Sequence, residues 1–247
     1  MDTEFVSNNI SKIKTITILV VSLIIFATAV VLWQTQDLDS RIVIGHNFIV
    51  ENSLYLNTSQ IISRYGMGFI AVVYGILALL TFKFEALEPA RPLFMLIIFT
   101  FGFGSISGDL LKNVINRARP VAELAGQIAS TTPPGSPAFP SGHATKSMTL
   151  ALPFFLVAAI KDFATRLVKA LTLTSAVLVC YSRIALQRHY LSDVLGGIGV
   201  ALLFVVIANW FVNRFYERMK IDQTRLATLT KRLGFVFFGL AVLLYMI

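Results

Sequence analysis

The chain has 247 residues, of which 56% are hydrophobic and only 14% are charged. A soluble domain of this length would carry about 25% charged residues, so the composition excludes an ordinary soluble protein and indicates an integral membrane protein. The formal net charge of +8 raises the question of nucleic acid, but the positions of the basic residues argue against a nucleic-acid partner.

Apolar runs long enough to cross a hydrocarbon core of about 30 Å recur along the chain, at 15–33, 66–82, 92–111, 145–160, 167–182 and 194–213. A seventh run, over 233–247, has only 15 residues, so it predicts a helix that spans thinly or lies in the interface. The first run is too long, and too quickly followed by others, for a cleaved signal peptide. The sequence therefore predicts one all-α domain over 1–247, a polytopic bundle of six transmembrane helices followed by a basic linker and a short hydrophobic helix in 214–247.

The basic residues separate the two sides of this bundle. Thirteen of the 21 Lys and Arg residues fall in four segments, at 1–14, 83–91, 161–169 and 214–232. These segments alternate along the chain, so they lie on one side, and the positive-inside rule predicts that this side and the N-terminus are cytoplasmic. Six of these residues crowd into 214–232, where they can contact anionic lipid.

The first of three polar segments runs from Lys112 to Pro120, at the outer end of the third apolar run. Lys112 and Arg119 are cations that match the negative charge that builds on phosphoryl oxygens in a transition state. Basic side chains that snorkel from a helix end explain the same stretch equally well in isolation. For Arg117 we expect snorkelling or lipid headgroup contact and no catalytic role, and we expect Asp109 to pair with a basic residue of the site.

The second segment is Pro140-Ser141-Gly142-His143, where the fourth apolar run begins. Ser141 and the backbone N–H groups of Gly142 and His143 can face an anion at a helix N-terminus. The imidazole of His143 can protonate a departing oxygen and later deprotonate water. Taken alone, the segment also fits a capped turn without catalytic function.

The third segment contains Ser182 and Arg183, followed by His189 and Asp193. If the chain is helical here, His189 and Asp193 share a face. The carboxylate can then hold one ring nitrogen and leave the other free to attack, as in an oriented nucleophile. Arg183 can donate a forked pair of hydrogen bonds to a phosphoryl group. The alternative is an ordinary His–Asp pair at the membrane rim.

The sequence gives little support for a metal site. The single Cys180 lies inside an apolar run, and the chain has no CxxC motif or Cys/His cluster of the kind that binds zinc. No acidic cluster with the spacing of hard-cation ligands is present either. We therefore predict activity without a metal or another cofactor.

Together the three segments resemble the signature of the type 2 phosphatidic acid phosphatase superfamily, which reads Lys-x6-Arg-Pro, Pro-Ser-Gly-His and Ser-Arg-x5-His-x3-Asp. Every fixed position matches, in the right order, within a motif-bearing core at 92–213. The resemblance implies a phosphohistidine intermediate at His189, held by Asp193, with His143 as the acid and base. It also implies phosphate binding by five residues, Lys112, Arg119, Ser141, Gly142 and Arg183.

Within this superfamily the chain looks like bacterial lipid phosphatases that act on phosphatidylglycerol phosphate, undecaprenyl pyrophosphate or lipid A. The resemblance implies a lipid phosphate substrate in the bilayer. It also implies a place in the bacterial inner membrane. Because the three segments lie opposite the basic side, we expect the active site to face the periplasm or the exterior. The lipid itself and the oligomeric state are not specified by the sequence.

Two other functions stay open at this point. A phosphotransferase would use the same phosphoenzyme and pass the phosphate to a second lipid instead of water. A transporter would line a pathway with intramembrane charges, but the charges here gather at one face and not through the bilayer midplane.

Lys146 adds a more specific expectation. It follows His143 by three residues, so a helical fourth run places it about one turn deeper on a neighbouring face. Its ammonium group can meet a second anionic group of the substrate, such as a distal phosphate or a lipid headgroup. Alternatively, Lys146 pairs with Asp109 or Glu123, or reaches the membrane rim.

Overall fold

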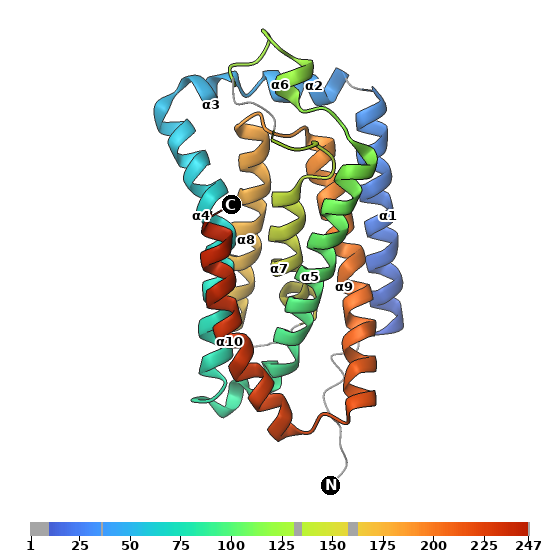
Figure 1. Ribbon diagram of the computed structural model, residues 1–247, viewed down its shortest axis with the longest axis vertical. Coiled ribbons are helices and arrows are strands. Elements are labelled where there is room, and N and C mark those ends of the chain that lie inside the picture. Colours follow the sequence, from blue (N-terminus) through green and yellow to red (C-terminus); the bar gives the residue numbers. More distant parts are fainter. Residues whose placement is uncertain (1–9, 36, 131–134, 158–162, 247) are drawn as a thin grey trace.

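The computed structural model describes residues 10–35, 37–130, 135–157 and 163–246. Within these ranges the chain forms helices and no strands, as predicted. Figure 1 shows a bundle of long helices that run roughly parallel or antiparallel to one another. They are α1 (Lys12–Thr35), α4 (Ser53–Leu80), α5 (Arg91–Ile115), α7 (Gly142–Val157), α8 (Phe163–Ala185), α9 (Leu191–Met219) and α10 (Gln223–Met246).

Short helices lie at both ends of the bundle. Helices α2 (Asp37–Ile44), α3 (Asn47–Glu51) and α6 (Pro120–Glu123) lie together at one end, which we call the motif end because the three polar segments reach it. The 3-10 helix η1 (Glu85–Ala90) connects α4 and α5 at the other end. We call that second end the basic end.

Six helices of the described part are long and apolar enough to cross a membrane, in agreement with an integral membrane bundle. Helix α7 has 16 described residues and reaches the end of a described range at Val157. The C-terminal helix, by contrast, is not short. Helix α10 has 24 residues and begins ten positions before the apolar run that predicted it. Its first turns pack Leu226 and Thr230 inward and expose basic side chains, a pattern that average hydropathy hides.

The predicted basic linker in 214–232 is therefore helical on both sides of one tight turn. Lys220 closes α9 in the left-handed region with φ 48°, and α10 begins three residues later. The six basic residues of this segment, Arg214, Arg218, Lys220, Arg225, Lys231 and Arg232, are all exposed.

Helix α7 occupies the centre of the bundle, where it contacts α4, α5, α8 and α9. Its hydroxyl side chains are buried and bond to carbonyl groups of its own preceding turn; Thr145 Oγ1 donates to the Ser141 carbonyl at 3.0 Å. A helix that is surrounded by other helices faces little lipid, which explains why α7 can carry buried hydroxyl side chains.

Two glycines let the neighbouring helices approach α7 closely. A Cβ at Gly197 of α9 would lie 2.9 Å from the carbonyl oxygen of Ser141, and a Cβ at Gly104 of α5 would lie 2.5 Å from Cγ2 of Thr149. Either contact would force the helices apart, so small residues are required here. As a result, the ends of α5 and α9 that carry the first and third segments lie beside the start of α7.

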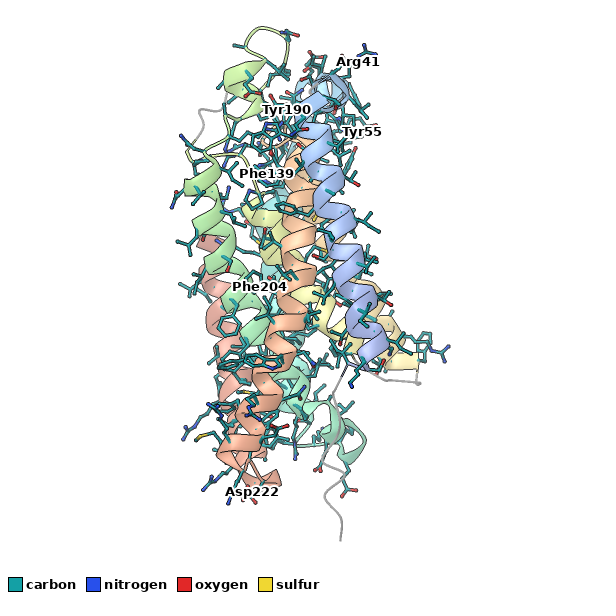
Figure 2. All side chains as sticks on the ribbon, turned by 90° about the vertical axis from the view of Figure 1, so that its right-hand side faces the viewer. Arg41, Tyr55, Phe139, Tyr190, Phe204 and Asp222 are labelled. Atoms are coloured by element: carbon teal, nitrogen blue, oxygen red, sulfur yellow. The ribbon has the colours of Figure 1, made fainter. Side chains whose placement is uncertain are left out.

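All three polar segments reach the motif end of the bundle (Figure 1). Figure 2 shows Phe139 and Tyr190, which flank the second and third segments, towards the same end as Arg41, with Asp222 at the opposite end. The helix ends that carry the basic segments lie at that opposite end. The predicted separation into two faces is confirmed, while the cytoplasmic position of the basic end stays a prediction.

Candidate active site

The His189–Asp193 pair forms at the start of α9. Asp193 is the third residue of this helix, and its Oδ2 accepts the N–H of Tyr190 at 2.9 Å, which satisfies a free donor at the helix N-terminus. The same oxygen lies 3.3 Å from Nδ1 of His189. Both side chains are buried, with exposed fractions of 1% and 0%. The predicted pairing of these two residues is confirmed.

The surroundings of His189 favour a neutral imidazole. Burial, and after it the positive charges of Arg183, Arg119 and Lys112, lowers the pKa of His189 well below its ordinary value. The ring is therefore neutral at pH 7. A neutral ring that donates its Nδ1–H to Asp193 keeps a lone pair on Nε2, which is the form that a nucleophile requires.

Arg183 lies in the last turn of α8 and is buried. Its Nη1 donates to Ser63 Oγ of α4 at 2.5 Å, and its carbonyl accepts the backbone N–H groups of Arg188 at 3.0 Å and His189 at 3.2 Å. Within the described residues its Nε is buried without a hydrogen-bond partner. A buried donor left unpaired costs roughly 1–3 kcal/mol, so an acceptor such as a phosphoryl oxygen would be favoured there.

Backbone carbonyls orient the other two cations. Lys112 Nζ donates to the Pro137 carbonyl at 2.9 Å. Arg119 donates through Nε to the Ser136 carbonyl at 2.7 Å and through Nη1 to the Arg188 carbonyl at 3.3 Å. Helix α5 ends at Asn116 in the left-handed region with φ 48°, which turns the chain and brings the two cations of the segment to one place.

The second segment links the first and the third. The backbone N–H of Ser141 donates to the Asp193 carbonyl at 2.8 Å, which ties the start of α7 to the start of α9. The Ser141 side chain is fully buried, with Oγ 3.5 Å from the Ala144 N–H. At Gly142, a Cβ would lie 3.4 Å from Cε of Lys112. The second segment therefore packs directly against the other two.

His143 is half-buried and belongs to the same cluster. Its ring interacts electrostatically with Arg183, His189, Lys146 and Arg119. Lys112 in turn interacts with Arg119, Asp193 and Lys146. The structure thus brings the predicted residues of all three segments into one site, where their individual roles stay predictions.

The structure shows an ion pair for Lys146. Its Nζ lies 3.7 Å from Asp109 Oδ2, and Lys146 is half-buried while Asp109 is exposed. This pairing is the alternative that the sequence had left beside a substrate contact. The distance is long for an ion pair and the partner faces solvent, so the interaction is weak.

The expected lipid contact of Arg117 is wrong. Its side chain is buried, and its Nη1 donates to Asp193 Oδ1 at 2.8 Å while Nη2 donates to Asp39 Oδ2 at 3.1 Å. Asp39 lies 78 residues earlier in the chain, and no local pattern connects the two positions. Sequence reasoning therefore missed both residues as parts of the site.

Across the described ranges, no three His, Cys, Asp or Glu side chains are grouped in a way that could hold a metal ion. Metal-independent activity stays a prediction.

Known proteins resemble this chain in sequence and in fold. Residues 93–217, about half of the chain, match the model of the PAP2 superfamily. Phosphatidylglycerophosphatase B of Bacillus subtilis (strain 168) is 29% identical over 131 residues, which are 50% of this chain and 62% of that protein. The match thus spans less than two thirds of this relative's length.

A solved structure also resembles the bundle. The crystal structure of the first transmembrane PAP2 type phosphatidylglycerolphosphate phosphatase, from Bacillus subtilis, superposes with a TM-score of 0.58 at 23% sequence identity. The superposition covers 83% of this chain and 96% of that one. At this identity the likeness shows a shared fold.

Proposed function

The chain belongs to the PAP2 superfamily, and we propose that it is a membrane lipid phosphatase that forms a phosphohistidine at His189. The observation that carries this proposal is the buried His189–Asp193 pair beside Arg183, whose Nε is buried without a partner in the described structure. Lys112 and Arg119 add two more cations to the same site. An oriented imidazole among three cations fits in-line attack on a phosphoryl group.

In the first step, Nε2 of His189 attacks phosphorus, and the bond from phosphorus to the lipid oxygen breaks. His143 gives its proton to that departing oxygen, and the negative charge of the bound phosphate favours the protonated ring that this step requires. Asp193 stabilises the imidazolium that forms at His189. Lys112, Arg119 and Arg183 offset the charge on the three equatorial oxygens.

In the second step, water attacks phosphorus, and His143 takes a proton from it. The bond between phosphorus and Nε2 breaks, inorganic phosphate leaves, and His189 returns to its neutral form. Ser141 and Gly142 supply the start of α7, whose free backbone N–H groups can bind a phosphate oxygen. No step in this scheme requires a metal ion.

We propose phosphatidylglycerol phosphate as the substrate, because both similar proteins carry that activity in their names. The site lies at the end of a membrane bundle, where a lipid headgroup would reach it. The distribution of basic residues supports a position on the periplasmic side of a bacterial inner membrane. Undecaprenyl pyrophosphate and lipid A are the other substrates to compare.

The test is phosphate release by the purified protein in detergent, from phosphatidylglycerol phosphate, phosphatidic acid, undecaprenyl pyrophosphate and lipid A. We expect the fastest release from phosphatidylglycerol phosphate, no loss of rate in EDTA, and inhibition by vanadate, which mimics the transition state. Activity that disappears in EDTA and returns with magnesium would contradict the mechanism. Transfer of phosphate to an added lipid alcohol at the expense of free phosphate would instead identify a phosphotransferase.

A further inference from the structure

We infer that Arg117 and Asp39 are positioning residues for the reaction: they hold Asp193, and through it His189, in the geometry for attack. This inference rests on the proposed function. Neither residue belongs to the fixed positions of the three segments, and Asp39 lies outside the region that matches the family model.

Arg117 fixes one side of the Asp193 carboxylate. Its Nη1 donates to Asp193 Oδ1 at 2.8 Å, while Oδ2 of the same carboxylate faces His189 and the Tyr190 N–H. Because both oxygens are engaged, the carboxylate cannot rotate away from the imidazole. The guanidinium is held in turn by aromatic rings, with its carbon 4.2 Å from the ring centroid of Tyr190 and 5.2 Å from that of Trp33.

Asp39 anchors Arg117 from the N-terminal part of the chain. It is fully buried on α2, and its Oδ2 accepts from Arg117 Nη2 at 3.1 Å. Its Oδ1 accepts the backbone N–H of Ser192 at 3.0 Å, and Oδ2 also accepts the Ser192 hydroxyl. One carboxylate therefore connects α2 to the first turn of α9, directly beside Asp193.

A second contact holds the same two regions together. Gln187, in the loop that carries His189, donates through Nε2 to the Val43 carbonyl at 3.0 Å and to Asn47 Oδ1 at 2.6 Å. It also accepts the Ser130 N–H at 2.9 Å. Helices α2 and α3 thus contact the loop before α9 at Gln187, and α2 also contacts the start of α9 at Ser192.

The charges along this chain of contacts alternate, and this alternation gives Asp39 an electrostatic role. Asp39, Arg117 and Asp193 carry −, + and − charges, so with a neutral His189 the buried cluster has a net charge of −1. Attack on phosphorus converts His189 to an imidazolium, which brings the net charge of the cluster to zero. Without Asp39, Arg117 would neutralise Asp193 fully, and the imidazolium would form in a cluster that becomes positive.

The test compares Asp39→Asn with Asp37→Asn. Both residues lie on α2 and both pair with an arginine, but Asp37 is exposed and bonds only to Arg41 among the contacts that the described structure shows for it. Outer partners of metal-bound histidines contribute roughly 10- to 100-fold to activity, and we expect a loss in this range for Asp39→Asn. The loss should be in kcat, with KM for phosphatidylglycerol phosphate within about twofold, since Asp39 does not contact the lipid.

A single-turnover measurement separates this role from a merely structural one. We expect Asp39→Asn to slow phosphoenzyme formation more than phosphoenzyme hydrolysis, because only formation creates the imidazolium. A purely structural defect would lower the amount of active enzyme, and so the amplitude, without changing the rate. If Asp39→Asn does not fold, Arg117→Lys carries the test. It keeps the charge but lacks two separate nitrogen atoms for the two carboxylates, so it should lower kcat at least as much.

If wild type and Asp37→Asn release phosphate and Asp39→Asn does so with a kcat within twofold of theirs, the positioning role is overturned and the proposed function stands. If the wild-type protein releases no phosphate from any lipid, the proposed function fails and the positioning role fails with it. Slow phosphoenzyme formation by the folded Asp39→Asn variant, with a normal KM, is the result that we expect.

Discussion

The two ends of the bundle are both rich in charge, but several charged side chains are buried at one end and the clustered basic side chains are exposed at the other. At the motif end, Lys112, Arg117 and Arg183 are buried, and each donates to a named oxygen of another segment. At the basic end, the arginines and lysines of 214–232 are exposed. An ion pair such as Arg214–Glu217 joins two neighbouring turns of one helix and no distant elements.

Whether a charge is buried or exposed says more about its function than the net charge does. Burying a charge is costly unless it is paired and hydrogen-bonded, so buried cations require fixed partners or a bound anion. Exposed basic residues at a membrane surface cost little and are attracted to anionic headgroups. The motif end therefore has the features of a site that was built for a ligand, and the basic end those of a surface that lies on lipid.

The largest effect is expected for His189→Ala. It removes the attacking nitrogen, so phosphate release should fall by about 10⁴-fold or more. The matched control is His46→Ala, because His46 lies at the same end but contacts the Ile42 carbonyl and the ring of Tyr181 instead of the site. Phosphate release and thermal stability in detergent are measured for both. Substantial phosphate release by His189→Ala would show that His189 is not the nucleophile.

His143→Ala should cost less, and its cost should depend on the leaving group. Loss of a general acid typically lowers rates by about 10²–10⁴-fold, and a lipid alkoxide needs the proton most. An aryl phosphate such as 4-nitrophenyl phosphate needs little protonation, so it should restore part of the activity of His143→Ala and none of His189→Ala. Equal restoration in both variants would contradict the assignment of the two histidines.

Lys146→Met should have a smaller and selective effect. Phosphatidylglycerol phosphate carries a second anionic group beside the phosphate that is removed, whereas phosphatidic acid does not. If Lys146 leaves its weak pair with Asp109 to bind that group, the variant should raise KM about tenfold for the first lipid and little for the second. Asp109→Asn is the control, because it frees Lys146 and should not raise KM. Equal effects on both lipids would show that Lys146 has a structural role and does not contact the second anionic group.

The smallest effect is expected at the basic end. The double variant Lys231→Gln/Arg232→Gln removes two exposed charges far from the site, so kcat in detergent should stay within about twofold of wild type. Its binding to vesicles that contain anionic lipid should weaken, which a flotation assay measures. A large loss of kcat in detergent would show that the two ends are coupled and would break the contrast between them.

The sequence predicted those parts of the site that lie close together along the chain. The pairing of His189 with Asp193 was predicted from a helix that would include both residues. In the structure α9 begins at Leu191, so His189 lies in the preceding loop and Asp193, in the first turn of α9, reaches back to it. The convergence of the three segments follows from their common place at the outer ends of apolar runs. The resemblance to a superfamily added roles for these residues but did not show how they contact one another.

What the sequence could not predict depends on contacts between distant segments. Arg117 resembles any basic residue at a helix end until α2 brings Asp39 to it, and a contact over 78 positions leaves no local pattern. The central place of α7 has the same cause, because its hydroxyl residues are tolerated only after four helices surround it. The true length of α10 was hidden by basic residues that lie on its exposed side.

If His189 takes the phosphoryl group, the phosphoenzyme can be trapped at this residue. The wild-type protein is mixed briefly with phosphatidylglycerol phosphate labelled in its terminal phosphate and quenched in alkali, and the labelled peptide is identified by mass spectrometry. We predict label on His189 that is absent in His189→Ala. Label on another residue, or rapid phosphate release without any labelled protein, would contradict the account.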